Sequence, residues 1–437
     1  MNLPFSIAQR QILRHAAVLS LVFCVTGCAS WPRSWGARPC CIQAKPVVHR
    51  EPVWWHLFDV TVVSQVENSF ELARVGRRLF GSPVRAQNLH DGYVGNSAFF
   101  TDRDPVELSL EQVRWGPTRP DDVAVAPFTI TKPKTEGKTP GLFVTDARGR
   151  RYLLKLDPIE APELLSGAEV VTSKLLYALG YHVPGYEVGF ITPGELQIAS
   201  PATHHDGRGV SPPFTDEALR AIVEPRLRDG VMRVGVTKIL EGDILGPARF
   251  KRFRDCAEIR ALRVAYAWLN NIDAKDHNSL LVWNGRETVG YLIDFGTSLG
   301  ADAGAAGPKQ PCAGWTNIVD LQEASLTFLT LGWHHPTCDV QRNPESSSVG
   351  LFSPHVNPDR WKPYAPNLAF QEMTESDARW IARRMARLTR AQITAAVSAG
   401  QYHDPADAAY LVNMLEQRRR AIISQYLDDP SQEDPTP

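Results

Sequence analysis

A strongly polar loop lies between two apolar elements in residues 268–283, WLNNIDAKDHNSLLVW. An amphipathic helical pattern ends at Leu269, and an apolar strand pattern runs from Leu280 to Trp283. The asparagine, aspartate and lysine side chains between them are costly next to buried elements unless each one has a partner. We therefore predict that this loop carries a functional site.

The spacing of the loop's carboxylates and amides suits phosphoryl transfer. Asp273 precedes Asn278 by five residues, and Asp294 ends the second of two predicted strands, sixteen residues further on. The chemistry needs a carboxylate that orients or deprotonates the acceptor hydroxyl, and oxygen ligands that hold Mg²⁺ on the phosphates. We predict Asp273 as the catalytic base, Asn278 and Asp294 as metal ligands, and Lys275 as a cation that steadies the phosphoryl group.

The preceding part of the chain offers a candidate phosphate clamp. Lys155 stands among leucines in a predicted strand, and Glu169 follows fourteen residues later inside a predicted helix. A lysine in such surroundings requires an ionic partner. A strand lysine bridged to a helix glutamate positions the phosphates in kinases. We therefore predict an ion pair between Lys155 and Glu169.

Two further stretches are candidates for nucleotide contacts. The segment KTEGKTPG contains Gly137, Lys138 and Thr139, whose backbone N–H groups suit a phosphate, although the same residues equally suit a plain turn. The segment KILEGD is the predicted hinge between two lobes. There, backbone groups from Ile239 to Glu241 are expected to hold the edge of an adenine ring.

The clearest local pattern is a hairpin followed by a helix. The segment GLFVTDARGRRYLLKLD predicts two strands joined by a turn at DARG. After it, apolar residues recur at positions 164, 168, 171, 175 and 179, which form one face of a helix. Gly180 then predicts the end of that helix.

The order of predicted elements indicates an α+β chain in two lobes, because strand patterns dominate before residue 242 and helical patterns after it. The predicted organisation consists of a tether with irregular structure (28–120), a β-rich N-lobe (121–241), a helical C-lobe (242–430) and a tail (431–437).

Together these motifs resemble the protein-kinase-like superfamily. The strings DAKDHN and LIDFG are closer to its atypical HipA-like and phosphatidylinositol-kinase-like branches. The string KTEGKTPGLFVTDARGRRYLLKLDP is similar to sequences in a group of bacterial lipoproteins, and the resemblance spans roughly residues 95–425. It implies a bilobal fold, ATP and Mg²⁺ as ligands, and a hydroxyl acceptor on a protein or small molecule. The chain lacks a G-x-G-x-x-G loop and an A-P-E segment, so the substrate platform of ordinary protein kinases is not implied.

Each candidate residue also has an ordinary structural interpretation. Glu169 fits a capping box with Ser166, Lys155 suits a solvated edge strand, and Asp294 suits the turn after its strand. The loop residues suit helix ends and turns. Their order and spacing together favour the kinase-like interpretation. A non-catalytic nucleotide- or ligand-binding protein with the same fold, a pseudokinase, stays as the alternative.

The N-terminus has the pattern of an export signal. Two arginines precede the apolar stretch AAVLSLVFCVTG, and VTGC at residues 25–28 resembles the lipobox of bacterial lipoproteins. The resemblance implies that residues 1–27 are removed and that Cys28 carries lipid, with an ordinary cleaved signal as the alternative. Alanine at position 29, in place of aspartate, implies sorting to the outer membrane. We expect a bacterial envelope protein, lipid-anchored and facing the periplasm.

Replacing Cys28 with serine is predicted to release the protein from membranes, because the acyl chains are the expected anchor. Membrane fractionation of cells that express the wild type and the variant measures this. Equal retention of the two proteins in the membrane fraction would contradict the anchoring prediction.

The composition limits the remaining partners. The 437 residues carry a formal net charge of −1, which gives no electrostatic reason to expect nucleic acid as a partner. No run of 18 apolar residues is present, so the only expected membrane attachment is the lipid anchor. Cys312 and Cys338 flank one loop region and could pair in an oxidising compartment.

Overall fold

The computed structural model describes residues 45, 52–71, 74, 76–77, 80–81, 83–134, 139–199, 213–334 and 345–428. The predicted lipid-bearing Cys28 and the loop residues Gly137 and Lys138 lie outside this set. Cys312 is part of a disulfide bond, and Cys338, its expected partner, also lies outside the described residues.

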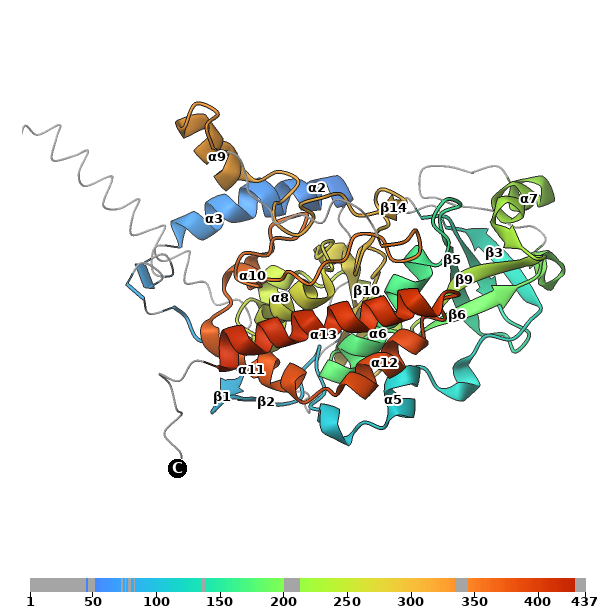
Figure 1. The fold of residues 1–437 in the computed structure, drawn as a ribbon, viewed down its shortest axis with the longest axis horizontal. Helices are drawn as coiled ribbons and strands as arrows, with labels where there is room; N and C mark the ends of the chain where they lie inside the picture. The colour runs from blue at the N-terminus through green and yellow to red at the C-terminus, as the bar shows by residue number, and fades with distance from the viewer. Residues whose placement is uncertain are drawn as a thin grey trace, which may run out of the picture.

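The N-lobe is built on a seven-stranded sheet in the order β6–β9–β5–β4–β3–β7, with β8 pairing with β9 (Figure 1). Neighbouring strands are antiparallel except for the parallel pair β3–β7. The strands are β3 (Phe128–Pro133), β4 (Gly141–Thr145), β5 (Arg151–Leu156), β6 (Tyr186–Ile191), β7 (Leu196–Ile198), β8 (Leu227–Arg228) and β9 (Val231–Lys238).

The two faces of this sheet have different roles, because successive side chains of a strand point to opposite sides. Leu154 and Leu156 of β5 belong to an apolar core with Val234 and Val236 of β9. That core is covered by α7 (Asp216–Val223). Lys155 points to the opposite face, where α6 (Leu164–Leu179) packs.

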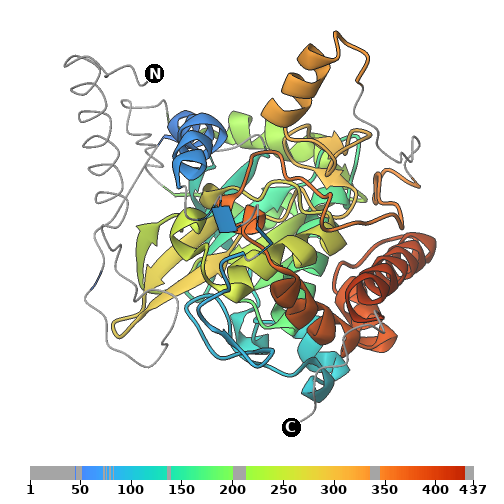
Figure 2. The same ribbon diagram turned by 90° about the vertical axis from the view of Figure 1, so that its left-hand side faces the viewer.

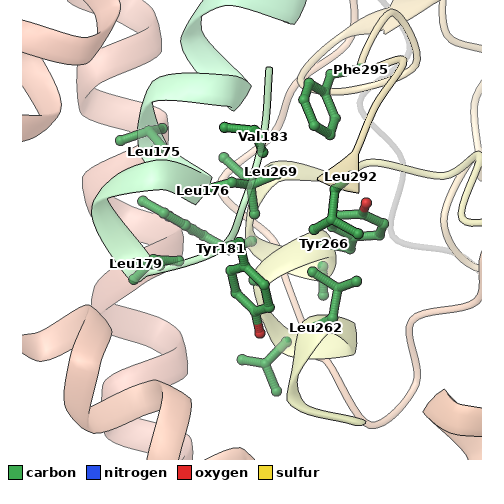
Figure 3. Close-up of a cluster of buried hydrophobic side chains, with 14 of the residues drawn as sticks. Leu175, Leu176, Leu179, Tyr181, Val183, Leu262, Tyr266, Leu269, Leu292 and Phe295 are labelled. Atoms are coloured by element: carbon green, nitrogen blue, oxygen red, sulfur yellow. The ribbon is translucent and has the colours of Figure 1, made fainter. Parts of the chain in front are cut away.

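Helix α6 joins the sheet to the C-lobe. Its Leu175, Leu176 and Leu179 pack with residues of α8 (Ala257–Leu269) in one continuous core (Figure 3). The helix ends at Gly180, whose φ of 109° is in the left-handed region, and a Cβ there would collide with the Phe100 ring. Glycine is therefore needed at this helix end.

The C-lobe is mostly helical and contains one three-stranded sheet in the order β10–β11–β12. Helix α13 runs along its surface and packs on α11 and α12 (Figure 1). The sheet strands are β10 (Asp243–Gly246), β11 (Ser279–Trp283) and β12 (Thr288–Leu292), and the later helices are α9 (Leu321–Leu329), α10 (Leu368–Gln371), α11 (Glu375–Ala386), α12 (Arg390–Ser398) and α13 (Pro405–Leu427). The predicted α+β class with two lobes is confirmed.

The N-terminal segment contains short elements and lies against the C-lobe. It forms α2 (Val53–Phe58), the π-helical η1 (Asp59–Val63), α3 (Ser64–Phe70), β1 (Leu89–His90), β2 (Tyr93–Val94) and α5 (Leu110–Trp115). The remaining elements are the strands β13 (Ala301–Asp302) and β14 (Gly307–Pro308) and the 3₁₀ turns η2 (Pro105–Glu107), η3 (Pro120–Asp122), η4 (Pro193–Glu195), η5 (Glu224–Arg226), η6 (Phe250–Phe253) and η7 (Asp276–Asn278).

Much of residues 83–120, which look irregular in the sequence, is part of the folded body. Val94, Phe99, Phe100 and Val113 are fully buried in the same core as α6 and α8. Within the part of the chain that the structure describes, no helix is both long and apolar enough to cross a bilayer.

Candidate active site

Lys155 joins three elements at the junction of the lobes. Its Nζ donates to Glu169 Oε1 of α6 and lies 2.8 Å from Asp294 Oδ1, just after β12. The Lys155 and Glu169 side chains are both buried. The predicted ion pair is therefore present, and Asp294, predicted only as a metal ligand of the same site, bonds to Lys155 as well.

A buried N-terminal cap fixes the helix that carries Glu169. Asp157 Oδ1 accepts from the backbone N–H groups of Leu165 and Ser166 at 2.9 and 2.8 Å, and Asp157 Oδ2 accepts from the Ser166 hydroxyl at 2.6 Å. Because Ser166 is bound to Asp157, the alternative in which Glu169 closes a capping box with Ser166 is wrong. Glu169 is instead free to face Lys155.

The three charges shift one another's protonation. Burial raises the pKa of Glu169 from its ordinary 4.5 to about 7, against the opposing effect of Lys155. Burial also favours the neutral form of Asp294, but the charge and hydrogen bond of Lys155 outweigh it and lower the pKa of Asp294 to about 2. Burial alone would lower the pKa of Lys155, yet the two carboxylates raise it well above its ordinary value. Lys155 and Asp294 are thus held in their charged forms.

Asp294 is the open member of the cluster. Its side chain is 43% exposed, in contrast to Lys155 and Glu169. Its backbone has a φ of 61°, which is uncommon for a residue other than glycine, and its N–H donates to the Tyr186 hydroxyl at 3.1 Å. This geometry leaves the carboxylate both bound to Lys155 and accessible to a ligand.

The polar loop is held by its own side chains. After α8 ends at Leu269, the Asn278 side-chain amide donates to the main-chain carbonyl of Asp273 at 2.7 Å, and Lys275 Nζ lies 2.5 Å from Asp273 Oδ2. The turn η7 then leads into β11. The loop therefore presents the Asp273 carboxylate beside the Lys275 cation. The Asn278 side-chain N–H closes the loop, and the Asn278 side-chain oxygen is the candidate ligand atom for Mg²⁺.

Backbone hydrogen bonds hold this loop beside the segment that carries Asp294. The Ile293 N–H donates to the Asn278 carbonyl at 3.0 Å, and the Ile272 N–H donates to the Thr297 carbonyl at 3.3 Å. After the effects of burial and Lys155, the charges of Lys134 and Lys275 lower the pKa of Asp294 further. Two more lysines thus lie near the open carboxylate.

Thr139, Ile239 and Glu241, the other predicted nucleotide contacts that the structure describes, already have partners within the protein. Thr139 is buried, and its carbonyl accepts from Lys134 Nζ at 3.1 Å. The predicted hinge does lie between β9 and β10, but the Ile239 N–H donates to the Arg151 carbonyl at 3.0 Å. That N–H is therefore used by the sheet, and the other backbone groups from Ile239 to Glu241 stay as the predicted adenine contacts. Glu241 is exposed and pairs with Lys238 at 2.9 Å.

A cavity of about 550 Å³ borders the hinge residues but is a different site. Its lining includes Tyr152 and Val236, which lie on the sheet face opposite Lys155. A second cavity, of about 380 Å³, is lined by Arg103, His182 and their neighbours. Neither cavity contains Lys155, Glu169 or Asp294 in its lining.

Sequence reasoning missed two residues near the cluster. Lys134 follows β3 and reaches toward Asp294, although its position directly before KTEGKTPG was an available signal. Thr237 pairs with Leu153 in the register of β5 and β9, so it shares the face of Lys155. Among the described residues, no hydrogen-bond partner reaches its buried hydroxyl. Strand register, which places Thr237 there, cannot be read from the sequence.

The arrangement fits a Mg²⁺–polyphosphate complex chemically. An accessible carboxylate and an amide oxygen, from Asp294 and Asn278, are ligand types that Mg²⁺ accepts alongside phosphate oxygens. Lys134, Lys155 and Lys275 supply positive charge on the same side. Asp273 adds a carboxylate that can act on a hydroxyl.

Neither a protein-family model nor a curated protein sequence matches this chain. Among solved structures, the Helicobacter pylori proinflammatory kinase CtkA is similar over 70% of this chain and 97% of its own, with 11% identity and a TM-score of 0.37. The Golgi casein kinase with Mn/ADP bound is similar over 71% of this chain and 79% of its own, with 9% identity and a TM-score of 0.28. Scores this low carry no argument. The bilobal α+β fold rests instead on the strand order and the helices of this chain.

Proposed function

We propose that this protein is a phosphotransferase that uses ATP and Mg²⁺ and acts on a hydroxyl of a protein or small-molecule acceptor. The observation that carries the proposal is the bridge from Lys155 to both Glu169 and Asp294, beside the loop that contains Asp273 and Asn278. This bridge joins β5, α6 and the segment after β12. It places a phosphate-binding lysine beside a candidate metal ligand, an arrangement that suits phosphoryl transfer.

Each residue has a separate task in this proposal. Asn278 and Asp294 would hold Mg²⁺, which when bound supplies charge neutralisation and orientation at the phosphates. Lys155, fixed by Glu169, binds phosphate oxygens. Asp273 accepts the proton of the acceptor hydroxyl, and Lys275 orients the Asp273 carboxylate and offsets charge on the transferred group.

An envelope location with a lipid on Cys28 belongs to the same proposal and is supported by the export-signal pattern. The same pattern favours the alternative function, a non-catalytic nucleotide- or ligand-binding lipoprotein, because the periplasm contains little ATP. The two functions differ in one respect that can be measured, which is turnover.

Replacing Lys275 with alanine is expected to slow transfer by about 10²-fold, because a positioned donor at a developing charge contributes on that order. The measurement is the rate of label transfer from γ-labelled ATP to envelope extract. Lys251→Ala is the control, since Lys251 pairs with Glu67 outside the cluster and its loss should leave the rate unchanged.

If the wild type transfers no label and hydrolyses no nucleotide with any donor and metal tried, the enzyme proposal fails. Equal rates for the wild type and Lys275→Ala would leave the enzyme proposal in place but remove Lys275 from the mechanism.

A further inference from the structure

Two exposed sets of apolar side chains have no counterpart in the function described above. One set, on α2, η1 and α3, includes Trp54, which is 68% exposed. The other set lies at the C-terminal end of α9 and in the residues directly after it. Phe328, in α9, is 80% exposed, and Trp333, after the helix, is 89% exposed. Large aromatic side chains at such exposure are unusual on a protein surface that meets only water. We call these two sets together the apolar face, and its members are Trp54, Phe58, Val62, Val66, Phe328, Leu329, Leu331 and Trp333.

The first set forms a regular stripe. Trp54, Phe58, Val62 and Val66 recur every four residues along consecutive helical turns, so they lie on one side of the helix. His56, by contrast, is buried. The helix therefore buries one side against the protein and presents a second, apolar side outward.

Contacts on the inner side fix this orientation. His56 Nδ1 lies 3.6 Å from Asp276 Oδ2, and the His56 and His277 rings are 4.8 Å apart. Lys251 pairs with Glu67 of α3. Turning the apolar stripe inward would break these contacts and expose the buried His56.

The second set lies in a segment without charge. Residues 324–333, ASLTFLTLGW, contain no Asp, Glu, Lys or Arg. Figures 1 and 2 both show α9 projecting from the same upper side of the molecule as α2 and α3. The helices that carry the two sets therefore lie on one side of the molecule, within reach of a single partner.

Trp, Phe, Leu and Val presented on the outer side of a helix are the composition of elements that lie in the interfacial layer of a bilayer. The chain length agrees with this partner. Only 23 residues lie between the predicted lipid site Cys28 and Pro52, at the start of α2, and a chain of that length spans at most about 80 Å. The anchor would thus keep the domain within reach of the membrane surface, where the apolar face can contact it.

We propose that the apolar face inserts into the headgroup and upper acyl layer of a phospholipid bilayer. The folded domain then contacts the membrane directly, in addition to the predicted lipid anchor. Contact through a few side chains is weak and reversible, so it orients the domain on the membrane and does not replace the anchor.

The test uses the full chain with Cys28→Ser, which removes the predicted lipid site, and vesicles of phosphatidylethanolamine and phosphatidylglycerol. Two double variants alter the apolar face, Phe328→Glu with Trp333→Glu and Trp54→Glu with Phe58→Glu. The control is Val106→Glu with Leu110→Glu. These control residues are about half exposed and lie in or beside α5, on the opposite side of the molecule (Figure 1).

Each face variant should lower the ratio of vesicle-bound to free protein at least about tenfold, a change worth about 1.4 kcal/mol. The control adds the same two negative charges and should change the ratio by less than about twofold. An unchanged ratio for both face variants would overturn the proposal. The proposal would also be overturned if the wild type is a dimer and the face variants dissociate it without losing vesicle binding. The apolar face would then bind a second copy of the chain.

A fluorescence measurement keeps the test independent of residues 1–27, which could bind vesicles by themselves. Brominated lipids should quench tryptophan emission of the vesicle-bound chain, and Trp333→Phe should remove part of that quenching. Trp115→Phe, on α5, should leave the quenching unchanged. Quenching that is the same in Trp333→Phe and in its parent would contradict the insertion of α9.

Discussion

Replacing Lys155 with methionine is expected to destabilise the protein by about 3–5 kcal/mol and to abolish nucleotide binding. Methionine preserves most of the side-chain volume but removes the only cation bonded to both Glu169 and Asp294 in the described structure. Removing one partner of a buried ion pair leaves an uncompensated buried charge, and that cost is of the stated order.

The loss of stability should depend on pH. In the wild type, burial raises the pKa of Glu169 from 4.5 to about 7, so the folded state binds more protons than the unfolded state between these values. The contribution of such a carboxyl to stability falls as the pH rises through this range. Without Lys155 the pKa of Glu169 rises further, so Lys155→Met should be more destabilising at pH 8 than at pH 5.

Urea unfolding of the variant at both pH values measures the effect. The matched control is Lys155→Met with Glu169→Leu, which removes both charges of the buried pair and should recover part of the stability at pH 8 without restoring nucleotide binding. A single variant within 1 kcal/mol of the wild type at pH 8 would show that the cluster contributes little to folding.

Replacing Asp273 with alanine is expected to lower the rate of transfer about 10²–10⁴-fold and to leave nucleotide binding nearly unchanged. The loop should keep its shape, because Asn278 binds the main-chain carbonyl of Asp273, which alanine retains. Initial rates with labelled ATP and the dissociation constant of the nucleotide separate the two effects. A variant that retains the wild-type rate would exclude Asp273 as the base.

Local patterns predicted the parts of the fold that local physics determines. The turn signal at DARG and the apolar strands beside it became β4 and β5, paired with Leu142 opposite Leu154. The periodic apolar residues before Gly180 became α6. The polar loop after Leu269 was identified because so many polar groups next to buried elements need partners.

Tertiary contacts determine what the sequence could not indicate. Ser166 is three residues before Glu169, as in a capping box, but a carboxylate nine residues earlier in the chain binds it instead. Asp294 joins Lys155 across 139 residues. Phe99 and Phe100 are buried from a segment without helical or strand period, because an irregular loop can enter a core without leaving a repeating pattern.

Unfolding in the presence of Mg²⁺–ATP tests most directly whether Lys155, Asn278 and Asp294 form a site for this ligand. Binding to the folded state alone should stabilise the wild type by about 2.7 kcal/mol at a ligand concentration of 100 times Kd. Asp273→Ala should show the same stabilisation, and Asp294→Ala should show none. No stabilisation of the wild type by any nucleotide and divalent metal, or equal stabilisation of Asp294→Ala, would contradict the account.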